Sequence, residues 1–364
     1  MLRTRPITRG NRLVWGQTSV YLLCFSLVGI LSATLGPSIA SFSAAAGVPP
    51  SELSTLFVTD AFGSVCGSLL AGHLLDRIAP HVQAVLGLTG ITALVVAIPL
   101  LTRPELLLPA WWGLGMSKTF LIVTVNTLLI RVRSEQVGPY MNVADFFLGV
   151  GSLLMPMAIA QSITWTDDLR WAYWAAGLAA VLLMGRIWSL PSPRAAADRG
   201  GDAQAAPGRH PLVIPVAALL FLYVGAEISF SGWIPSYTLA RGITDSAATA
   251  AYYTSLFWIA ITVGRLLWLP VTRRWPPQRL ILVNVTACVL ILGALWVSPV
   301  SSLLLAVETV AFGFAMSSIF PSAFTWLAQR GEVTGKVSAW CLCAASVGAM
   351  FFPWWIGQFV VFQH

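Results

Sequence analysis

Long apolar stretches alternate with short polar ones along the whole chain. A helix needs about 20 mostly apolar residues to cross a bilayer. Eleven windows meet that length, near residues 13–40, 51–75, 82–101, 105–131, 136–162, 168–190, 211–238, 246–270, 278–297, 300–328 and 334–361. This pattern predicts an all-α integral membrane protein with eleven transmembrane helices.

Residues 197 positions apart match without a gap over most of the chain. The matching pairs are Gly67 with Gly264, Leu69-Leu70 with Leu266-Leu267, Arg77 with Arg274, Pro80 with Pro277, Glu135 with Glu332, Gly138 with Gly335, Val150-Gly151 with Val347-Gly348, and Pro156 with Pro353. They fall on Gly, Pro, Arg and Glu more than on the common Leu and Ala, so composition explains them poorly. The repeat predicts two parallel copies of one unit, as in the halves of large secondary transporters.

The repeat also predicts the domain organisation. We expect an N-terminal six-helix bundle over residues 1–190 and a C-terminal five-helix bundle over 211–364, in which the twelfth helix of the repeat is absent. Between them, Pro191–His210 is rich in Ala, Gly, Pro and Arg, which predicts a flexible cytoplasmic linker.

Composition supports the membrane class, and charge gives an orientation. Charged residues make up 10% of the chain, against about 25% in soluble domains. The net charge of +7 would favour a nucleic-acid partner in a soluble protein. Here, however, seventeen Lys and Arg fall in one set of loops and termini and three in the other. Because basic residues stay on the cytoplasmic side, we expect a cytoplasmic N-terminus. We expect the protein to lie in a plasma or inner membrane as a monomer, in contact with the lipid bilayer and not with nucleic acid.

Signals of enzymes and metal sites are missing from the sequence. There is no phosphate-binding Gly-Lys-Ser/Thr loop, no Cys/His group with metal-ligand spacing and no Gly-x-Ser-x-Gly turn. We therefore expect neither an enzyme nor a metal site, and no cofactor beyond a coupled H+ or Na+.

The loop after the second window resembles a known signature. Gly72-His73-Leu74-Leu75-Asp76-Arg77 is close to the Gly-x-x-x-Asp-Arg motif of the major facilitator superfamily. The resemblance implies two pseudo-symmetric bundles and a conformational switch formed by Gly72, Asp76 and Arg77. Asp76 is expected at the start of the eleventh helix, near Gly331–Lys336, where exposed backbone N–H groups favour a carboxylate.

A narrower resemblance concerns the fucose-permease-like and sodium-dependent-glucose-transporter-like branch. It rests on Tyr223–Glu227, Gly232–Tyr237 and Asn126–Leu129. It implies secondary active transport of a small polar solute, sugar-like or an organic anion, by alternating access. Two acidic residues of that branch are replaced here, by Ile122 and Gly36. An exporter of an amphipathic metabolite or drug, and a non-transporting receptor or partner of the same fold, are the alternatives.

Ionisable residues at bilayer depth are costly and usually face a cavity or a partner. Five stand out: Asp60, Lys118, Asp145, Glu227 and Glu308. Lys118 pairs with Asp60, which has a similar depth, or it contacts an anionic substrate or a coupled proton. Asp145 is expected to pair with Arg265, and Glu308 is a further ion-coupling or charge-pair candidate.

Candidate substrate contacts lie on the fourth and seventh windows. Asn126 is two turns beyond Lys118 and shares its helix face. Glu227 is in the middle of its window and has a depth similar to that of Lys118, so we expect both to face one cavity. Trp233 and Tyr237 follow Glu227, where aromatic rings can stack on a sugar. The predicted substrate-binding residues are Lys118, Asn126, Glu227, Trp233 and Tyr237.

Overall fold

The computed structural model describes residues 9–75, 77–192, 212–272, 274–297, 299–330 and 335–359, and helices are the regular elements in these ranges. Eleven of its helical segments are long and apolar enough to cross a membrane. In chain order the helices are α1 (Arg9–Ser32), α2 (Leu35–Ala46), η1 (Glu52–Ser54), α3 (Thr55–Leu74), α4 (Pro80–Ala97), η2 (Ile98–Leu100), α5 (Pro104–Val132), α6 (Val137–Thr166), α7 (Arg170–Ser189), α8 (Val213–Ala240), α9 (Ala247–Thr272), α10 (Pro277–Val297), α11 (Ser302–Met316), α12 (Ile319–Gln329) and α13 (Gly335–Phe359). The predicted all-helical class with eleven spans is confirmed.

Two predicted spans are each divided into two helices, which the apolar pattern did not indicate. The first window continues from α1 into α2, and the tenth from α11 into α12. Pro37 is the third residue of α2, and Pro321 is the third residue of α12. Because proline lacks an N–H, it cannot donate to the carbonyl four residues earlier. Those carbonyls belong to Ala33 and Ser317, and both helix breaks fall there.

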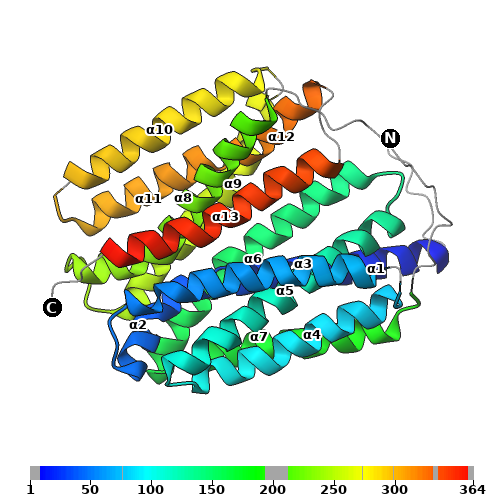
Figure 1. Cartoon of the computed structure of the whole chain (residues 1–364), viewed down its shortest axis with the longest axis horizontal. Helices are drawn as coiled ribbons and strands as arrows, with labels where there is room; N and C mark the ends of the chain where they lie inside the picture. The colour runs from blue at the N-terminus through cyan, green and yellow to red at the C-terminus, as the bar shows by residue number, and fades with distance from the viewer. Residues whose placement is uncertain are drawn as a thin grey trace.

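Helices α1 to α7 pack together, and so do α8 to α13 (Figure 1). In the first group α3 packs on α5 and α1 on α6. In the second group α9 packs on α11 and α8 on α13. Counted as spans, these are the second with the fourth and the first with the fifth, in both groups. The two halves therefore use the same helix pairing, as the internal repeat predicts.

Matching glycines make the same contact in each half. A Cβ added to Gly151 on α6 would lie 1.9 Å from the carbonyl oxygen of Ser26 on α1. A Cβ on Gly348, 197 residues later on α13, would lie 2.0 Å from the carbonyl oxygen of Phe221 on α8. Only glycine permits such backbone contact between helices, which is a common mode of packing in membranes.

Gly67 and Gly264 are equivalent in the same way. Gly67 on α3 packs against Met116 on α5, and Gly264 on α9 packs against Ser317 and Phe314 at the end of α11. Both glycines thus lie between the second and fourth spans of their half.

The two halves meet along α6 with α9, α3 with α13, and α2 with α8 and α9. Several of these contacts lie at the end of the molecule that holds α2, which we call the α2 end; it is at the left in Figure 1. There the Gln358 amide donates to the Ser54 hydroxyl at 2.9 Å. A Cβ on Gly36 would lie 2.7 Å from the Gly232 Cα. The halves are therefore joined at the α2 end.

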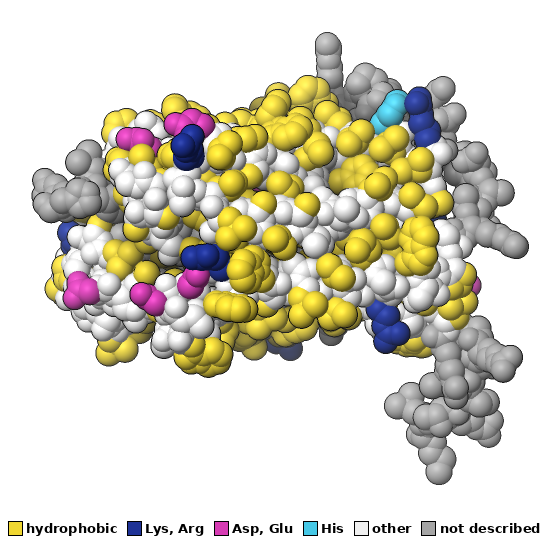
Figure 2. All heavy atoms as spheres, turned by 90° about the horizontal axis from the view of Figure 1, so that it is seen from below, with side chains coloured by type: hydrophobic (Ala, Val, Ile, Leu, Met, Phe, Trp, Pro, Cys, Tyr) yellow, Lys and Arg dark blue, Asp and Glu magenta, His cyan; other side chains and the backbone are white. Residues whose placement is uncertain are grey.

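The outer surface between the two ends is apolar. Large side chains away from the helix ends, such as Leu178, Leu182 and Leu290, are more than 60% exposed. Figure 2 shows hydrophobic side chains spread along one face, with most acidic side chains toward one end. Such a surface suits contact with lipid chains and would be unfavourable in water.

Candidate solute cavity and the ion pair in its wall

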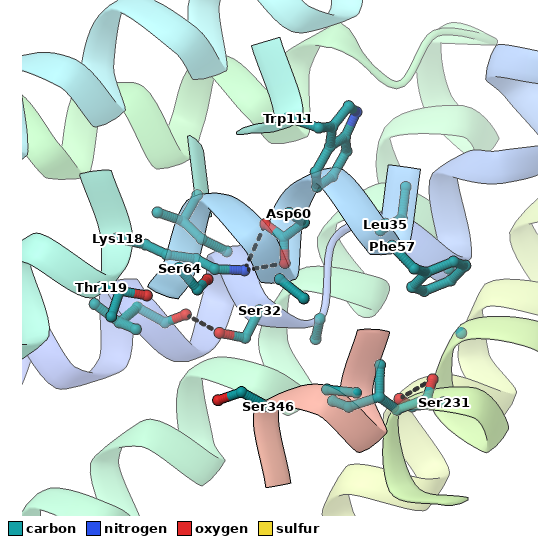
Figure 3. A pocket seen from close by; sticks show the side chains of 18 of the residues that line it. Ser32, Leu35, Phe57, Asp60, Ser64, Trp111, Lys118, Thr119, Ser231 and Ser346 are labelled. Atoms are coloured by element: carbon teal, nitrogen blue, oxygen red, sulfur yellow. Dashed lines mark hydrogen bonds and ion pairs between the residues drawn. The ribbon is translucent and has the colours of Figure 1, made fainter. Parts of the chain in front are cut away.

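A cavity of about 280 Å³ lies between the two halves (Figure 3). Its wall is built from residues of six spans. The lining residues are Val28, Leu31, Ser32, Ala33, Leu35 and Gly36 from the first span; Phe57, Asp60, Ala61 and Ser64 from α3; Trp111, Lys118, Thr119 and Ile122 from α5; Leu148 from α6; Ile228, Ser231 and Gly232 from α8; and Ser346 and Ala349 from α13.

An ion pair forms part of this wall. The Lys118 Nζ lies 2.8 Å from Asp60 Oδ1 and 2.7 Å from Oδ2, so both carboxylate oxygens accept from one ammonium group. The Lys118 side chain is 9% exposed and that of Asp60 is 21% exposed. Among the described residues that line the cavity, Asp60 is the acidic one and Lys118 is the basic one. Their charges cancel, so the described wall carries no net charge.

Close packing of α3 against α5 sets the geometry of this pair. A Cβ on Gly115 would lie 2.0 Å from the carbonyl oxygen of Asp60, so the two backbones touch there. Lys118 follows Gly115 by three residues and lies on the same side of α5. Its long side chain therefore reaches Asp60 across a short gap. Gly63 and Gly67 on α3 extend the same backbone contact toward Trp112 and Met116.

Hydroxyl groups supply the remaining polarity. Ser32, Ser64 and Ser231 each donate to a backbone carbonyl, of Val28, Gly115 and Ile228 respectively. Because a hydroxyl oxygen keeps two acceptor lone pairs after donating, each can still accept from a solute. Thr119 and Ser346 add two more hydroxyls, and Trp111 adds a large aromatic ring (Figure 3). Sequence reasoning missed all these residues, since isolated Ser and Thr in apolar helices give no distinctive pattern.

Glu227 lies away from this cavity. It is buried, it accepts a hydrogen bond of 3.1 Å from the Tyr223 hydroxyl, and it interacts electrostatically with Arg265 on α9. Its neighbour Ile228 lines the cavity, but Glu227 is not among the lining residues. The expectation that Lys118 and Glu227 share one cavity is therefore wrong for this conformation, because Lys118 is engaged by Asp60 and Glu227 points toward α9.

Arg265 interacts electrostatically with two carboxylates. Besides Glu227 it interacts electrostatically with Asp145 on α6, the helix of the other half that packs on α9. The electrostatic attraction between Asp145 and Arg265 is consistent with the predicted charge pair, and Glu227 is attracted by the same arginine.

Trp233 and Tyr237 have surroundings other than the cavity. Trp233 is buried, its indole Nε1 donates to the Pro353 carbonyl at 2.8 Å, and its ring packs 5.7 Å from that of Phe57. Tyr237 lines a separate small hollow together with Arg241 and Glu308. Neither residue is among those that line the cavity between the halves.

The remaining predicted residues lie at other depths or outside the described ranges. Asn126 is partly buried on α5, and its Oδ1 has no hydrogen-bond partner among the described residues. Gly72 is in the last turn of α3, and Arg77 follows in the loop. Asp76, and the segment 331–334 expected beside it, lie outside the described residues, so their predicted contact stays a prediction.

Comparison with known proteins decides the family. The sequence model of the Major Facilitator Superfamily matches residues 21–353, which is most of the chain. The chain belongs to the major facilitator superfamily. Members of this superfamily are secondary transporters built from two related bundles with the binding site between them, and the cavity described above is lined by residues of both halves.

Individual relatives and structures within the superfamily are similar over almost the full chain. A sodium-dependent glucose transporter 1 of Xenopus laevis is 24% identical over 89% of this chain and 72% of its own length. Its Homo sapiens counterpart is 25% identical over 92% and 72%. Among solved structures, a D-xylose-proton symporter superposes with a TM-score of 0.77 at 16% identity, covering 95% of this chain and 90% of that one. The nucleoside transporter NupG gives 0.73 at 14%, covering 96% and 91%.

Proposed function

We propose that this protein carries a small, uncharged, hydroxyl-rich solute such as a monosaccharide across the membrane by alternating access. The cavity between the halves carries this proposal. Its wall combines a neutral ion pair, several hydroxyl groups and an aromatic ring, which are groups that hydrogen-bond and stack on sugars. Its volume of about 280 Å³ is near the lower end of ligand pockets, which favours one small ring over a large amphipathic molecule.

The similar proteins support the same solute class. Two of them are named sodium-dependent glucose transporters, and the solved structures include a xylose transporter and a nucleoside transporter. An organic anion fits the cavity less well, because the positive charge of Lys118 is already neutralised by Asp60.

We further propose that the chain sits in a plasma or inner membrane as a monomer with its N-terminus in the cytoplasm. The distribution of Lys and Arg supports this orientation. It places the α2 end on the outer side, so the contacts Gln358–Ser54 and Gly36–Gly232 close the outer side of the cavity.

Uptake of radiolabelled solutes by proteoliposomes tests the proposal. The panel contains monosaccharides, nucleosides and organic anions, each with and without imposed proton or sodium gradients. We expect saturable uptake or counterflow for at least one neutral sugar. Uptake confined to organic anions would contradict the solute class. No uptake or counterflow of any solute would instead support the receptor alternative.

A further inference from the structure

The carboxylate in the cavity wall is already occupied by a cation that belongs to the chain. Coupling cations in transporters bind at the midplane, close to the solute, where oxygen ligands converge. Asp60 is the acidic residue among those lining the cavity, and both of its oxygens lie within 2.8 Å of the Lys118 Nζ. Figure 3 shows the ammonium pointing at the carboxylate from the neighbouring helix, with the Ser64 hydroxyl beside them.

This arrangement is confined to one half of the molecule. Asp60 is on α3 and Lys118 is on α5, and the two helices touch through Gly115 at the level of Asp60. Alternating access moves one half against the other, largely as rigid bodies. Such a movement does not separate α3 from α5, so the ammonium stays with the carboxylate throughout the cycle.

We propose that the Lys118 ammonium is a built-in replacement for a coupling metal cation at Asp60. It neutralises the carboxylate in every conformation, so the cavity binds its solute without Na+. Removing the ammonium exposes the Asp60 carboxylate beside the Ser64 hydroxyl, and oxygens of this kind are the ligands that hard cations prefer. Loss of Lys118 thereby creates a Na+ site. The inference rests on the proposed function only in treating this cavity as the solute pathway.

Thermal unfolding of the purified full chain in detergent tests this without any solute. Each protein is heated in NaCl and in choline chloride of equal ionic strength. We expect the melting temperature of the unsubstituted protein to be the same in both salts. Lys118→Ala should show a saturable rise of about 2–5 °C with Na+, because a ligand that binds only the folded state raises its stability. The double variant Lys118→Ala/Asp60→Asn should lose this rise.

Two further variants keep the test decisive. Lys118→Gln removes the charge with less loss of volume, and it replaces Lys118→Ala if the latter does not purify as a folded protein. Asp60→Lys/Lys118→Asp exchanges the two charges across the same helix pair, and it should be insensitive to Na+ like the unsubstituted chain.

Two results would overturn the proposal. One is Na+ stabilisation of the unsubstituted protein that Asp60→Asn abolishes, since Na+ would then bind beside Lys118. The other is folded Lys118→Ala and Lys118→Gln without any response to Na+. Since only cations are added, these outcomes can be told apart from a failure of the uptake experiment.

Discussion

Charges inside the bilayer form local groups in which opposite signs meet. Lys118 with Asp60 is one group, and Arg265 with Asp145 and Glu227 is another. Removing one partner of a buried pair leaves an uncompensated charge, at a cost of about 3–5 kcal/mol. The 21% exposure of the Asp60 side chain lowers that cost for the first group.

The Asp60–Lys118 pair is expected to show non-additive effects on stability. Asp60→Asn and Lys118→Gln should each lower the melting temperature. The double variant should lose less than the two single losses added together, because it leaves no isolated charge. Melting curves of the four proteins under one set of conditions give the coupling. Strictly additive losses would show that the contact contributes nothing to the folded state.

Trp233 is expected to act as a packing residue. Trp233→Phe removes the hydrogen bond to the Pro353 carbonyl but keeps an aromatic ring against Phe57. We expect a lower melting temperature, since the net contribution of such a bond is about 1 kcal/mol, with an unchanged KM in the uptake assay. A KM raised tenfold or more would place the indole in contact with solute after all.

The sequence predicts how far along its span a charged residue lies better than it predicts which neighbour the side chain faces. Asp60 and Lys118 have similar depths from the outer ends of their windows, so their pairing was one of the predicted alternatives. The position of Glu227 along its helix can be read from the sequence. Successive helical residues turn by about 100°, however, so that position does not fix which neighbouring helix the side chain meets. Its neighbour Ile228 lines the cavity instead.

At the scale of helices, glycines decide how closely spans approach. Gly115 meets the Asp60 carbonyl on α3, whereas a Cβ on Gly185 in α7 would meet nothing within 4 Å. Gly115→Ala should therefore push α3 from α5, disturb the Asp60–Lys118 pair and reduce both folded yield and uptake. Gly185→Ala is the matched control, and its intrinsic effect on a helix is favourable by about 1 kcal/mol. Equal behaviour of the two variants in size-exclusion chromatography and uptake would contradict this packing.

Span positions follow from apolar length, and their ends agree with the windows to within a few residues for most helices. Helix breaks were harder to predict because proline alone does not determine them. Pro37 and Pro321 each follow a break, but Pro156 and Pro235 lie inside uninterrupted helices. A proline frees backbone carbonyls, and neighbouring helices can satisfy them so that the helix continues. Which helices are neighbours depends on the tertiary structure, which the local sequence does not give.

For the whole molecule, the repeat at 197 residues indicated two halves, and the paired glycine contacts of Gly151 and Gly348 show how similar they are. The relative placement of the halves was not predictable, since a transporter populates more than one arrangement of the same two bodies. The contacts at the α2 end belong to one of these arrangements.

Linking the halves at the α2 end should stop transport. In Ser54→Cys/Gln358→Cys, a short bifunctional thiosulfonate reagent can bridge positions whose native side chains are 2.9 Å apart. We expect uptake to fall to background after treatment and to return when a reducing agent cleaves the bridge. Each single cysteine variant controls for modification of the five native cysteines. Full uptake by the bridged protein would mean that this end need not open.

The break between α1 and α2 has a consequence for how solute recognition can be studied. Ala33 lines the cavity, and Pro37 deprives its carbonyl of the usual helical donor. A main-chain oxygen of this kind is retained by every amino acid that can be placed at position 33. Mutational scanning of side chains will therefore miss whatever part of the affinity the peptide backbone provides, and backbone amide-to-ester replacement is the chemistry that would reveal it.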